Sequence, residues 1–200
     1  MLTHCLYMSD TDETAKQVWR SCPTCGAGQN EPLFAKGPLR VVRCSHCSML
    51  FANPVEAEFV EGTFYDRLAV PYYLSPDKLE GDYAPVRFVR ELRLFRQFCK
   101  SGSVLDVGCS TGAFLHHLAQ RFPGDYRTLG TDVTGPALDH AESRGVPVLR
   151  TPFWEHDFGG QRFDAVTFWA VLEHLAEPGR FCFFSICTSI GMPWQSQPGT

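Results

Sequence analysis

The chain has 200 residues, of which 44% are hydrophobic, and 18 Lys and Arg against 22 Asp and Glu leave a net charge of −4. This length allows one domain with a hydrophobic core of its own and a smaller accessory that is stabilised by other means. The slight negative charge supplies no overall positive field, so it disfavours nucleic acid as a partner without excluding it, and it predicts a small-molecule substrate.

Neither end of the chain has the pattern of a membrane or secretory segment. Residues 1–20 lack a basic start followed by an apolar stretch. The longest apolar run, residues 181–190, is far shorter than the ~20 residues that a bilayer-spanning helix needs. We therefore expect a cytoplasmic chain with no membrane segment, whose oligomeric state the sequence leaves open.

Composition divides the chain into four segments. Residues 1–20 are polar and are expected to be a flexible leader, and residues 21–54 are rich in Cys, Gly and Pro. Residues 55–85 form an aromatic connector, which suits either a lid over a substrate pocket or a linker packed on the main domain. Residues 86–200 show alternating strand and helix patterns and are expected to form the ligand-binding domain.

Two C-x-x-C pairs, at 22–25 and 44–47, are separated by eighteen residues. Such paired cysteines in a reducing compartment favour a metal site over disulfides, and the spacing is typical of four-cysteine zinc ribbons. The predicted ligands of a structural Zn²⁺ are Cys22, Cys25, Cys44 and Cys47. Four thiolates leave no open position for water, so we expect no catalysis at this metal; iron is the chemical alternative, and His46 is a candidate replacement for one sulfur.

Strands and helices alternate along the last segment. An amphipathic helix is predicted over 86–98, because its apolar residues recur at helical spacing. The remaining elements are strands at 103–107, 128–131, 146–149 and 163–169, and helices at 113–120 and 136–144. This order predicts an α/β fold, with a parallel sheet wrapped by helices.

A glycine-bearing turn, 108–112, follows the first of these strands. Small residues between a strand and a helix let backbone amides approach a ligand, so we expect a nucleotide-like cofactor. Asp106, two residues before Gly108, would repel the pyrophosphate of NAD, whereas it tolerates or attracts the ammonium and sulfonium groups of S-adenosylmethionine. The sequence therefore favours S-adenosylmethionine over a nicotinamide dinucleotide.

Asp132 directly follows the strand 128–131. At the carboxyl edge of a parallel sheet, its two oxygens can accept hydrogen bonds from the vicinal hydroxyls of a ribose. The alternative is an ordinary cap for the helix 136–144. The glycine turn at this distance favours the ribose role.

These motifs together resemble the class I S-adenosylmethionine-dependent methyltransferase family over residues 86–178. The resemblance rests on Asp106-x-Gly108-x-Ser110-x-Gly112, Asp132, Phe163-Asp164-Ala165-Val166, and Val171-Leu172-Glu173-His174-Leu175 with Pro178 after it. It implies a Rossmann-like sheet and methyl transfer, with cofactor contacts from Asp106, Gly108, Cys109, Ser110, Gly112, Asp132, Val133 and Glu173. Family members usually have glycine where Ser110 stands, although a small hydroxyl should still fit the turn.

The segment after the third strand departs from the family pattern. The resemblance often implies an acid there that meets the adenine amine, whereas residues 150–155 read Arg-Thr-Pro-Phe-Trp-Glu. Phe153 or Trp154 could stack on the base, or either could fill the hydrophobic core instead.

Methyl transfer is an in-line displacement, so a base is needed only where the acceptor must lose a proton. His174, beside Glu173 at the end of the fourth strand, is the candidate base. The alternative is that both residues cap the next helix and line the cofactor cleft. Tyr83 and Arg87, one helical turn apart, are candidates for the methionine carboxylate.

A zinc ribbon ahead of this domain resembles two arrangements, in enzymes that tailor sugars or natural products and in an enzyme that methylates ribosomal RNA. The first predicts a small-molecule acceptor of sugar, lipid or natural-product type. Only residues 179–200 follow Pro178, where the family resemblance implies further strands, so we expect the sheet to be incomplete at the C-terminus. An active methyltransferase, an NAD-dependent oxidoreductase and an inactive truncated remnant therefore all stay open.

Overall fold

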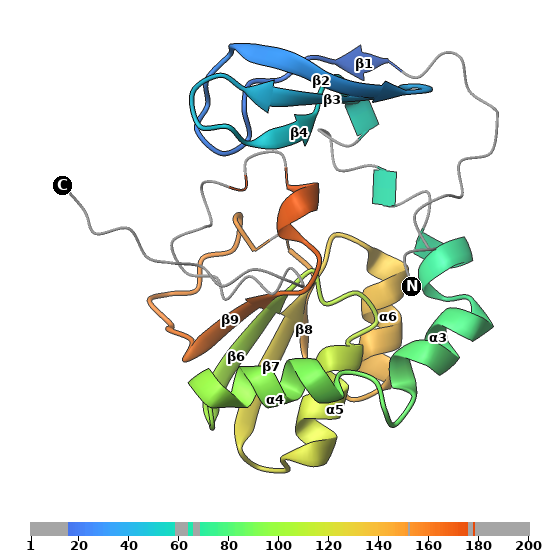
Figure 1. Cartoon of the computed structure of the whole chain (residues 1–200). Coiled ribbons are helices and arrows are strands. Elements are labelled where there is room, and N and C mark those ends of the chain that lie inside the picture. The colour runs from blue at the N-terminus through green and yellow to red at the C-terminus, as the bar shows by residue number, and fades with distance from the viewer. Residues whose placement is uncertain (1–15, 59–63, 66–68, 152, 176–177, 179–200) are drawn as a thin grey trace. The chain divides into compact units, whose positions relative to one another are not determined.

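We describe a computed structural model of the chain, over residues 16–58, 64–65, 69–151, 153–175 and 178 (Figure 1). The chain divides into two compact units, Met1–Glu61 and Gly62–Thr200. Within the described ranges, no helix has the length and apolarity that crossing a bilayer requires. The apolar run 181–190 and the expected C-terminal truncation lie outside the described residues. The fourfold division of the chain into leader, ribbon, connector and domain stays a prediction.

The first unit is a small antiparallel ribbon. Its three-stranded sheet has the order β2-β3-β4, and a second, two-stranded sheet pairs β1 with β5. The strands are β1 (Gln17–Val18), β2 (Asn30–Lys36), β3 (Leu39–Cys44), β4 (Leu50–Ala52) and β5 (Val55–Glu56). Among its described residues the buried cluster consists of Cys22, Val42, Cys44 and Phe51, and the partly buried Ala27 packs against it. A core this small needs another source of stability, as the cysteine spacing led us to expect.

A buried amide closes the ends of this ribbon. The Asn53 side chain is 1% exposed. It accepts a hydrogen bond from the Arg20 backbone N–H at 3.0 Å and donates one to the Arg20 carbonyl at 3.1 Å. Both polar ends of the amide are thereby satisfied, so the segment before the first cysteine pair is joined to the segment after β4.

The second unit contains a parallel four-stranded sheet of order β8-β7-β6-β9. Its strands are β6 (Gly102–Val107), β7 (Tyr126–Thr131), β8 (Val148–Leu149) and β9 (Ala165–Phe168). The helical elements are η1 (Ala69–Tyr73), α3 (Pro76–Tyr83), α4 (Val89–Phe98), α5 (Ala113–Arg121), α6 (Gly135–Ser143) and the 3-10 turn η2 (Leu172–His174). The predicted α/β fold with a parallel sheet is confirmed.

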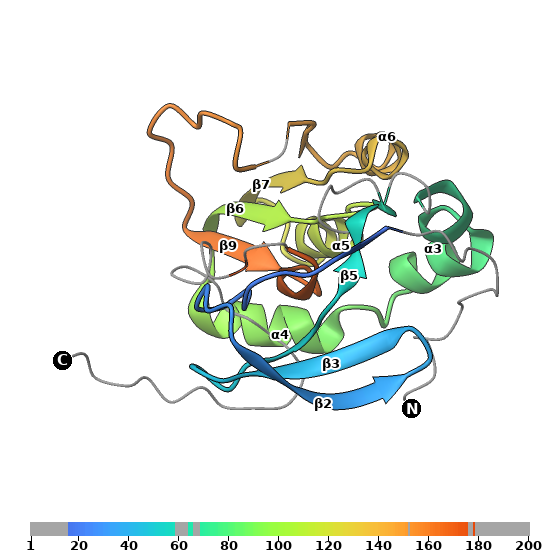
Figure 2. The ribbon, with the colours of Figure 1, turned by 90° about the horizontal axis from the view of Figure 1, so that it is seen from above.

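The two faces of the sheet are covered differently. On one face Val104 packs with the buried side chains of α4, α5 and α6, among them Leu92, Leu115 and Ala141, and Figure 2 shows these helices beside the strands. On the other face, Leu105, Val107 and Phe168 pack with aromatic side chains of an irregular segment, including Phe153, Phe158 and Phe163. Alternate residues of β6 thus serve opposite faces, which leaves Asp106 on the helical face.

Several predicted boundaries were wrong by one to three residues, and three of them have a clear physical reason. The helix predicted over 86–98 begins at Val89, because Phe88 adopts a left-handed φ of 61° that places its ring in the core. The last strand begins at Ala165 instead of 163, because the Asp164 carboxylate accepts a hydrogen bond from the Ser103 N–H at 2.7 Å. The strand predicted over 146–149 is shortened to Val148–Leu149, since the Val146 N–H bonds to Ala141 of α6.

Candidate cofactor site and metal centre

The glycine turn joins β6 to α5 at the carboxyl edge of the sheet. The N–H groups of Gly108 and Cys109 both donate to the Thr131 carbonyl of β7, at 2.7 and 3.0 Å. Gly108 has φ 70°, and a Cβ there would lie 2.4 Å from Cγ2 of Val171. A side chain at this position therefore meets both backbone strain and a steric clash, so glycine keeps the turn close to its neighbours.

Ser110 occupies the turn in a conformation that favours glycine. Its φ is 50°, in the left-handed region. The family pattern of glycine at this place therefore has a physical reason, and Ser110 departs from it at a cost in backbone strain. Gly112, with φ 77°, ends the turn against Ala141, whose Cβ would lie 2.8 Å from a Cβ at position 112.

Asp132 fastens the turn to the end of β7. One carboxylate oxygen accepts the Ser110 N–H at 2.8 Å, and the other accepts the Thr134 N–H at 3.0 Å. Burial raises the pKa of Asp132, while the hydrogen bonds from Ser110 and Thr134 oppose the shift. The N-cap of α6 is Thr134 rather than Asp132, so the simple capping alternative does not describe this residue. The neighbouring Val133 is 43% exposed at the same edge.

Asp106 lies below the turn and is 2% exposed. Its carboxylate accepts a hydrogen bond from the Thr167 hydroxyl of β9 at 2.7 Å. Burial raises the pKa of Asp106 to about 7. The hydrogen bond from Thr167 lowers this pKa, whereas the negative charge of Asp132 raises it further. Near neutral pH this carboxyl is therefore poised between its two protonation states. A cationic ligand beside it would favour the ionised form.

Cys109 contributes to the turn through its backbone. A Cβ on Gly130 would lie 2.6 Å from the Cys109 sulfur, so the thiol is directed at β7. Burial raises the pKa of this thiol, which keeps it neutral. Cys109 was predicted to bind the cofactor. Its thiol faces the sheet, and its backbone N–H is part of the turn.

The turn carries polar atoms that fit a bound cofactor. The hydroxyl oxygens of Ser110 and Thr111 are buried, and neither has a hydrogen-bond partner among the described residues. Trp169 directly follows β9, and its indole Nε1 is also buried without a hydrogen-bond partner among the described residues. Buried polar groups are normally paired, so three such atoms near one strand edge are consistent with a polar ligand. The residues present thus fit S-adenosylmethionine, which offers an ammonium, a carboxylate and ribose hydroxyls.

Glu173 and His174 lie on η2, just after β9, and both are exposed. They form the 3-10 turn itself, and the next helix that they were alternatively expected to cap lies outside the described residues. The His174 ring meets the ring of Tyr65 edge to face, with 5.6 Å between ring centres. Burial raises the pKa of Tyr65, and the charges of Tyr73, Glu173 and Asp132 add to this effect.

Burial likewise raises the pKa of Tyr73 to about 12, with a contribution from Asp132. Tyr65 and Tyr73 belong to the aromatic connector, and Asp132 acts on both of them. Part of this connector therefore lies within electrostatic range of the glycine-turn residues. Both phenols stay protonated at neutral pH and can act as hydrogen-bond donors.

Tyr83 is attached to the turn in a way that the sequence did not indicate. Its hydroxyl donates to the Thr111 carbonyl at 2.5 Å. Arg87, its predicted companion, instead lies over the Phe88 ring at 3.8 Å and pairs with Glu91 at 3.7 Å. The structure thus does not bring Tyr83 and Arg87 together. The hydroxyl of Tyr83 supports the turn.

The two aromatic residues after β8, Phe153 and Trp154, differ in burial although their rings meet edge to face. Phe153 packs against Phe168 in the core, with 6.0 Å between ring centres, whereas Trp154 is 51% exposed. For Phe153 the core-filling alternative therefore describes the structure. Within the segment 150–155 the acid is Glu155, which is exposed.

In the first unit, the four predicted cysteine sulfurs lie within 4.8 Å of one another. The closest pairs are Cys22 with Cys47 and Cys25 with Cys44, each with sulfurs 3.6 Å apart. A tetrahedral zinc with Zn–S bonds of ~2.3 Å requires sulfur separations of roughly 3.8 Å, so this donor set fits Zn²⁺. Backbone N–H groups of Cys47 and His46 lower the pKa of Cys44, whereas the neighbouring thiols raise the pKa of Cys25 and Cys47. The four thiols thus share their protons, and a bound metal would displace them.

Both cysteine pairs adopt the same backbone turn. The Cys22 N–H donates to Ala27 and its carbonyl accepts from Gly26, while Cys44 makes the same two bonds with Met49 and Ser48. Gly26 and Ser48 both have left-handed φ, of 74° and 63°. The two turns are thus local copies of each other. The sequence signal that was missed is Gly26, directly after the first C-x-x-C pair, because glycine adopts this conformation without strain.

Comparison with known proteins supports the assignment of the second unit. Residues 104–190 match a family model described as a methyltransferase domain. Over 90 residues the chain is 36% identical to the probable tRNA methyltransferase 9B of Mus musculus. The match covers 44% of this chain and 19% of that protein. The chain therefore spans about a fifth of the length of the curated relatives it matches.

Solved structures of methyltransferases are also similar. A TehB-like S-adenosylmethionine-dependent methyltransferase from Corynebacterium glutamicum has 22% identity and a TM-score of 0.43, over 52% of this chain and 58% of that chain. The S-adenosylmethionine-bound CalS10, an amino pentose methyltransferase from Micromonospora echinaspora, has 31% identity and a TM-score of 0.36, over 42% and 35%. The family model over residues 104–190 and the glycine-turn motifs both support a class I S-adenosylmethionine-dependent methyltransferase domain in the second unit.

Proposed function

We propose that this chain binds S-adenosylmethionine at the carboxyl edge of β6 and β7 and transfers its methyl group to a small-molecule acceptor. The observation that carries the proposal is the pair of carboxylates, buried Asp106 and half-buried Asp132, on either side of a turn with buried hydroxyls that have no partner among the described residues. The proposed cofactor contacts are Asp106, Gly108, Cys109, Ser110, Gly112, Asp132, Val133 and Glu173.

Asp132 keeps capacity for a ribose while it holds the turn. An ionised carboxylate has about four lone-pair sites, and the N–H groups of Ser110 and Thr134 occupy two of them. The remaining sites can accept hydrogen bonds from vicinal hydroxyls, as the sequence predicted. Because the same carboxylate orients the turn, loss of Asp132 is expected to disturb two cofactor contacts at once.

When bound, S-adenosylmethionine supplies an activated methyl group on a sulfonium. The chain then has to hold the acceptor in line with that methyl group and exclude water. Tyr65 lies edge to face with His174, so an aromatic side chain covers this candidate base on one side. For a hydroxyl or ammonium acceptor, His174 would take up the proton at an imidazole nitrogen; for a carbon or thiolate acceptor no base is needed.

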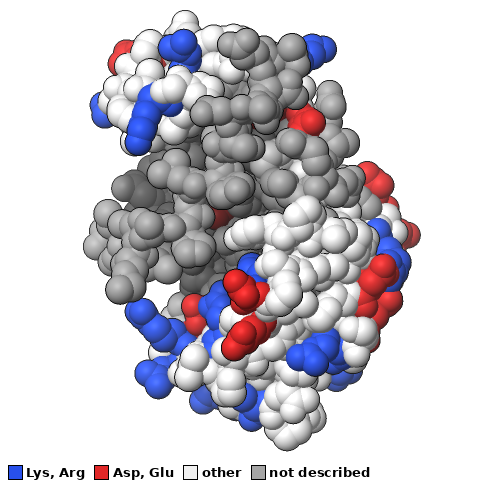
Figure 3. Space-filling model, turned by 90° about the vertical axis from the view of Figure 1, so that its right-hand side faces the viewer, with Lys and Arg blue, Asp and Glu red and all other residues white. Residues whose placement is uncertain are grey.

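A small-molecule acceptor is favoured by the distribution of charge. The chain carries a net charge of −4. On the face of the second unit drawn in Figure 3, Lys and Arg are interspersed with Asp and Glu. Polyanion binding usually depends on clustered cations, which release counterions from the phosphate backbone. A sugar, lipid or natural-product acceptor therefore suits this unit better than RNA, and a cytoplasmic location stays a prediction.

The first test is calorimetric titration of the zinc-loaded full chain with S-adenosylhomocysteine, with NADH as the competing ligand. Saturable binding of S-adenosylhomocysteine alone would support the proposal. Asp132→Asn is expected to weaken it by about tenfold or more, equivalent to roughly 1.4 kcal/mol. Asp77→Asn, at an exposed aspartate in the first turn of α3, should leave it unchanged. Binding of NADH alone would favour the oxidoreductase, and binding of neither ligand by folded protein would favour an inactive remnant.

His174 is tested separately, by turnover. With an amine or alcohol acceptor, His174→Gln is expected to lower kcat by roughly 10²-fold or more, within the range of general base catalysis, and to leave S-adenosylhomocysteine affinity unchanged. Unchanged turnover would assign His174 to the wall of the cleft.

One finding favours a second candidate acceptor. The curated relative at 36% identity is a probable tRNA methyltransferase, although the match covers 19% of it. We therefore include transfer RNA among the acceptors offered with tritiated S-adenosylmethionine. Incorporation into RNA that falls steeply with salt would support this candidate, because backbone binding releases counterions. Incorporation into amines or sugars alone would support the small-molecule proposal.

A further inference from the structure

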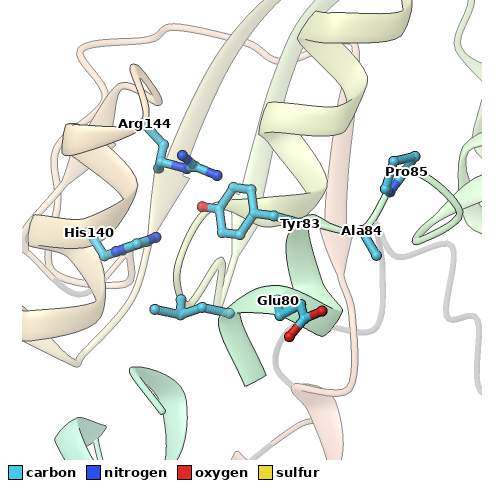
Figure 4. A pocket seen from close by; sticks show the side chains of 7 residues that line it. Glu80, Tyr83, Ala84, Pro85, His140 and Arg144 are labelled. Carbon is cyan, nitrogen blue, oxygen red and sulfur yellow. The ribbon is translucent and has the colours of Figure 1, made fainter. Parts of the chain in front are cut away.

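Besides the cofactor site, a second pocket lies between α3 and α6 (Figure 4). Tyr83 in its lining bonds through its hydroxyl to Thr111 of the glycine turn. Its volume is about 510 Å³, within the range of roughly 300–1,000 Å³ of pockets that hold small molecules. The lining residues are Leu79, Glu80, Tyr83, Ala84, Pro85, His140 and Arg144. None of the proposed cofactor-binding residues is among them.

The α6 side of this pocket presents donors to an anion. Arg144 lies over the Tyr83 ring, with 4.2 Å from its guanidinium carbon to the ring centre. In Figure 4 its guanidinium extends toward the phenol ring, next to His140. An aromatic face holds a guanidinium in place, and Arg144 also hydrogen-bonds to the Tyr83 side chain. Its remaining N–H groups can bind a carboxylate or phosphate. Arg144 is exposed, so such a ligand can reach it.

His140 lies one helical turn before Arg144 and adds a second donor. Its Nε2 atom is buried and has no hydrogen-bond partner among the described residues. The imidazole meets the Tyr83 ring edge to face at 5.6 Å. Burial, and then the charge of Arg144, lowers the pKa of His140, so the ring is neutral in the empty pocket. An anionic ligand would both pair this nitrogen and raise the pKa again.

The α3 side differs in character. Leu79, Ala84 and Pro85 supply apolar surface, and the one acid in the lining, Glu80, comes from this side. An anion is therefore favoured at the α6 end of the pocket and disfavoured at the α3 end. A ligand that satisfies both ends has one anionic group beside Arg144 and an apolar body along α3.

We propose that this pocket is a second ligand site, which binds an organic anion, a carboxylate or a phosphate monoester with an apolar body. The anionic group would accept hydrogen bonds from Arg144 and from Nε2 of His140. The apolar body would lie along Leu79, Ala84 and Pro85. The site is independent of the methyl acceptor, because its lining includes neither Glu173 nor His174.

The test is calorimetric titration of the full chain with three six-carbon probes, sodium hexanoate, hexyl phosphate and 1-hexanol. We expect saturable binding of at least one anion, and binding of 1-hexanol at least about tenfold weaker, because the alcohol lacks charge-assisted bonds. The two anions distinguish a carboxylate site from a phosphate site. Arg144→Gln should weaken anion binding by about tenfold or more, while Arg93→Gln, at an exposed arginine of α4 outside the pocket, should not.

Ala84→Trp tests the same site without a change of charge, because the indole would fill the pocket. Circular dichroism melts of each variant check that the fold is kept. Each titration is repeated with saturating S-adenosylhomocysteine, so that failure of the cofactor proposal is seen separately. The inference would be overturned by the absence of binding of both anions, by undiminished binding to folded Arg144→Gln and Ala84→Trp, or by complete competition with S-adenosylhomocysteine.

Discussion

The carboxylate of Asp132 holds the backbone N–H of Ser110 at 2.8 Å, across twenty-two positions of sequence. The residue at 110 has a left-handed φ of 50°, so this hydrogen bond stabilises a strained backbone at the point where the cofactor is proposed to bind. Strain of this kind persists only where surrounding contacts compensate for it, and active sites are common places for it.

Ser110→Gly should therefore stabilise the unliganded chain. Glycine adopts a positive φ without a Cβ penalty, and the substitution also removes a buried hydroxyl with no described partner. We expect the free energy of unfolding to rise by roughly 1 kcal/mol, measured by urea denaturation. The same change in α6, Ser143→Gly, should lower it by about 0.5 kcal/mol, because glycine is a poor helix former. Destabilisation by Ser110→Gly would mean that the hydroxyl makes a stabilising bond after all.

Gly108→Ala is expected to destabilise the turn by roughly 2–3 kcal/mol, since it combines backbone strain with steric overlap. The new Cβ would lie 2.4 Å from Val171 Cγ2. At Gly145, with a similar φ of 78° and open space around it, the same substitution should cost only about 1 kcal/mol of strain. Adding Val171→Ala to Gly108→Ala should recover part of the loss, and a double-mutant cycle of thermal melts measures it. Simple additivity of the two substitutions would refute the predicted contact.

The stability of the second unit should depend on Asp106. Its pKa is raised to about 7 in the folded chain, against about 3.9 for an unfolded aspartate. Between these two pKa values the folded state holds a proton that the unfolded state releases. The contribution of protonated Asp106 to the free energy of unfolding is therefore fully present below about pH 4 and is lost as pH rises through about 7.

Asp106→Asn removes this dependence and keeps an oxygen that can accept the Thr167 hydroxyl. The free energy of unfolding of the variant relative to wild type should rise by about 1.4 kcal/mol per pH unit between roughly pH 4 and 7. Urea melts at several pH values give this difference, in which zinc-linked effects common to both proteins cancel. A difference that does not vary with pH would show that Asp106 ionises at its ordinary pKa. Asp77→Asn is the control for a surface carboxyl.

Metal removal should act on the first unit. We expect one zinc per chain by elemental analysis, lost in Cys44→Ser and retained in Cys99→Ser, which changes a buried cysteine of the second unit. The ribbon has only four residues in its buried cluster, and structural zinc contributes folding free energy directly, so a chelator should unfold it. Iron in place of zinc would contradict the assignment of the metal. Retention of zinc by Cys44→Ser would contradict that of the ligands.

Local patterns in the sequence predicted much of this protein. The alternation of strands and helices predicted the parallel sheet, and C-x-x-C spacing predicted that four cysteines converge, because both follow from regular geometry over short stretches. The same holds for the strand, glycine turn and helix around Gly108. In each case, the residues that form the feature are neighbours in sequence, and their backbone geometry limits where the side chains can lie.

Only the tertiary structure decided what surrounds these residues. Thr167 donates to Asp106 across 61 positions, and Tyr83 donates to Thr111 across 28. Neither contact follows from periodicity, since the first depends on which strand pairs with β6 and the second on how α3 packs against α5. Phe88 likewise leaves the helical pattern because its ring is buried in the core. The sequence therefore determined the type of site, whereas packing between distant segments determined its hydrogen bonds, its pKa shifts and the second pocket. Such contacts form only when separate elements share one hydrophobic core.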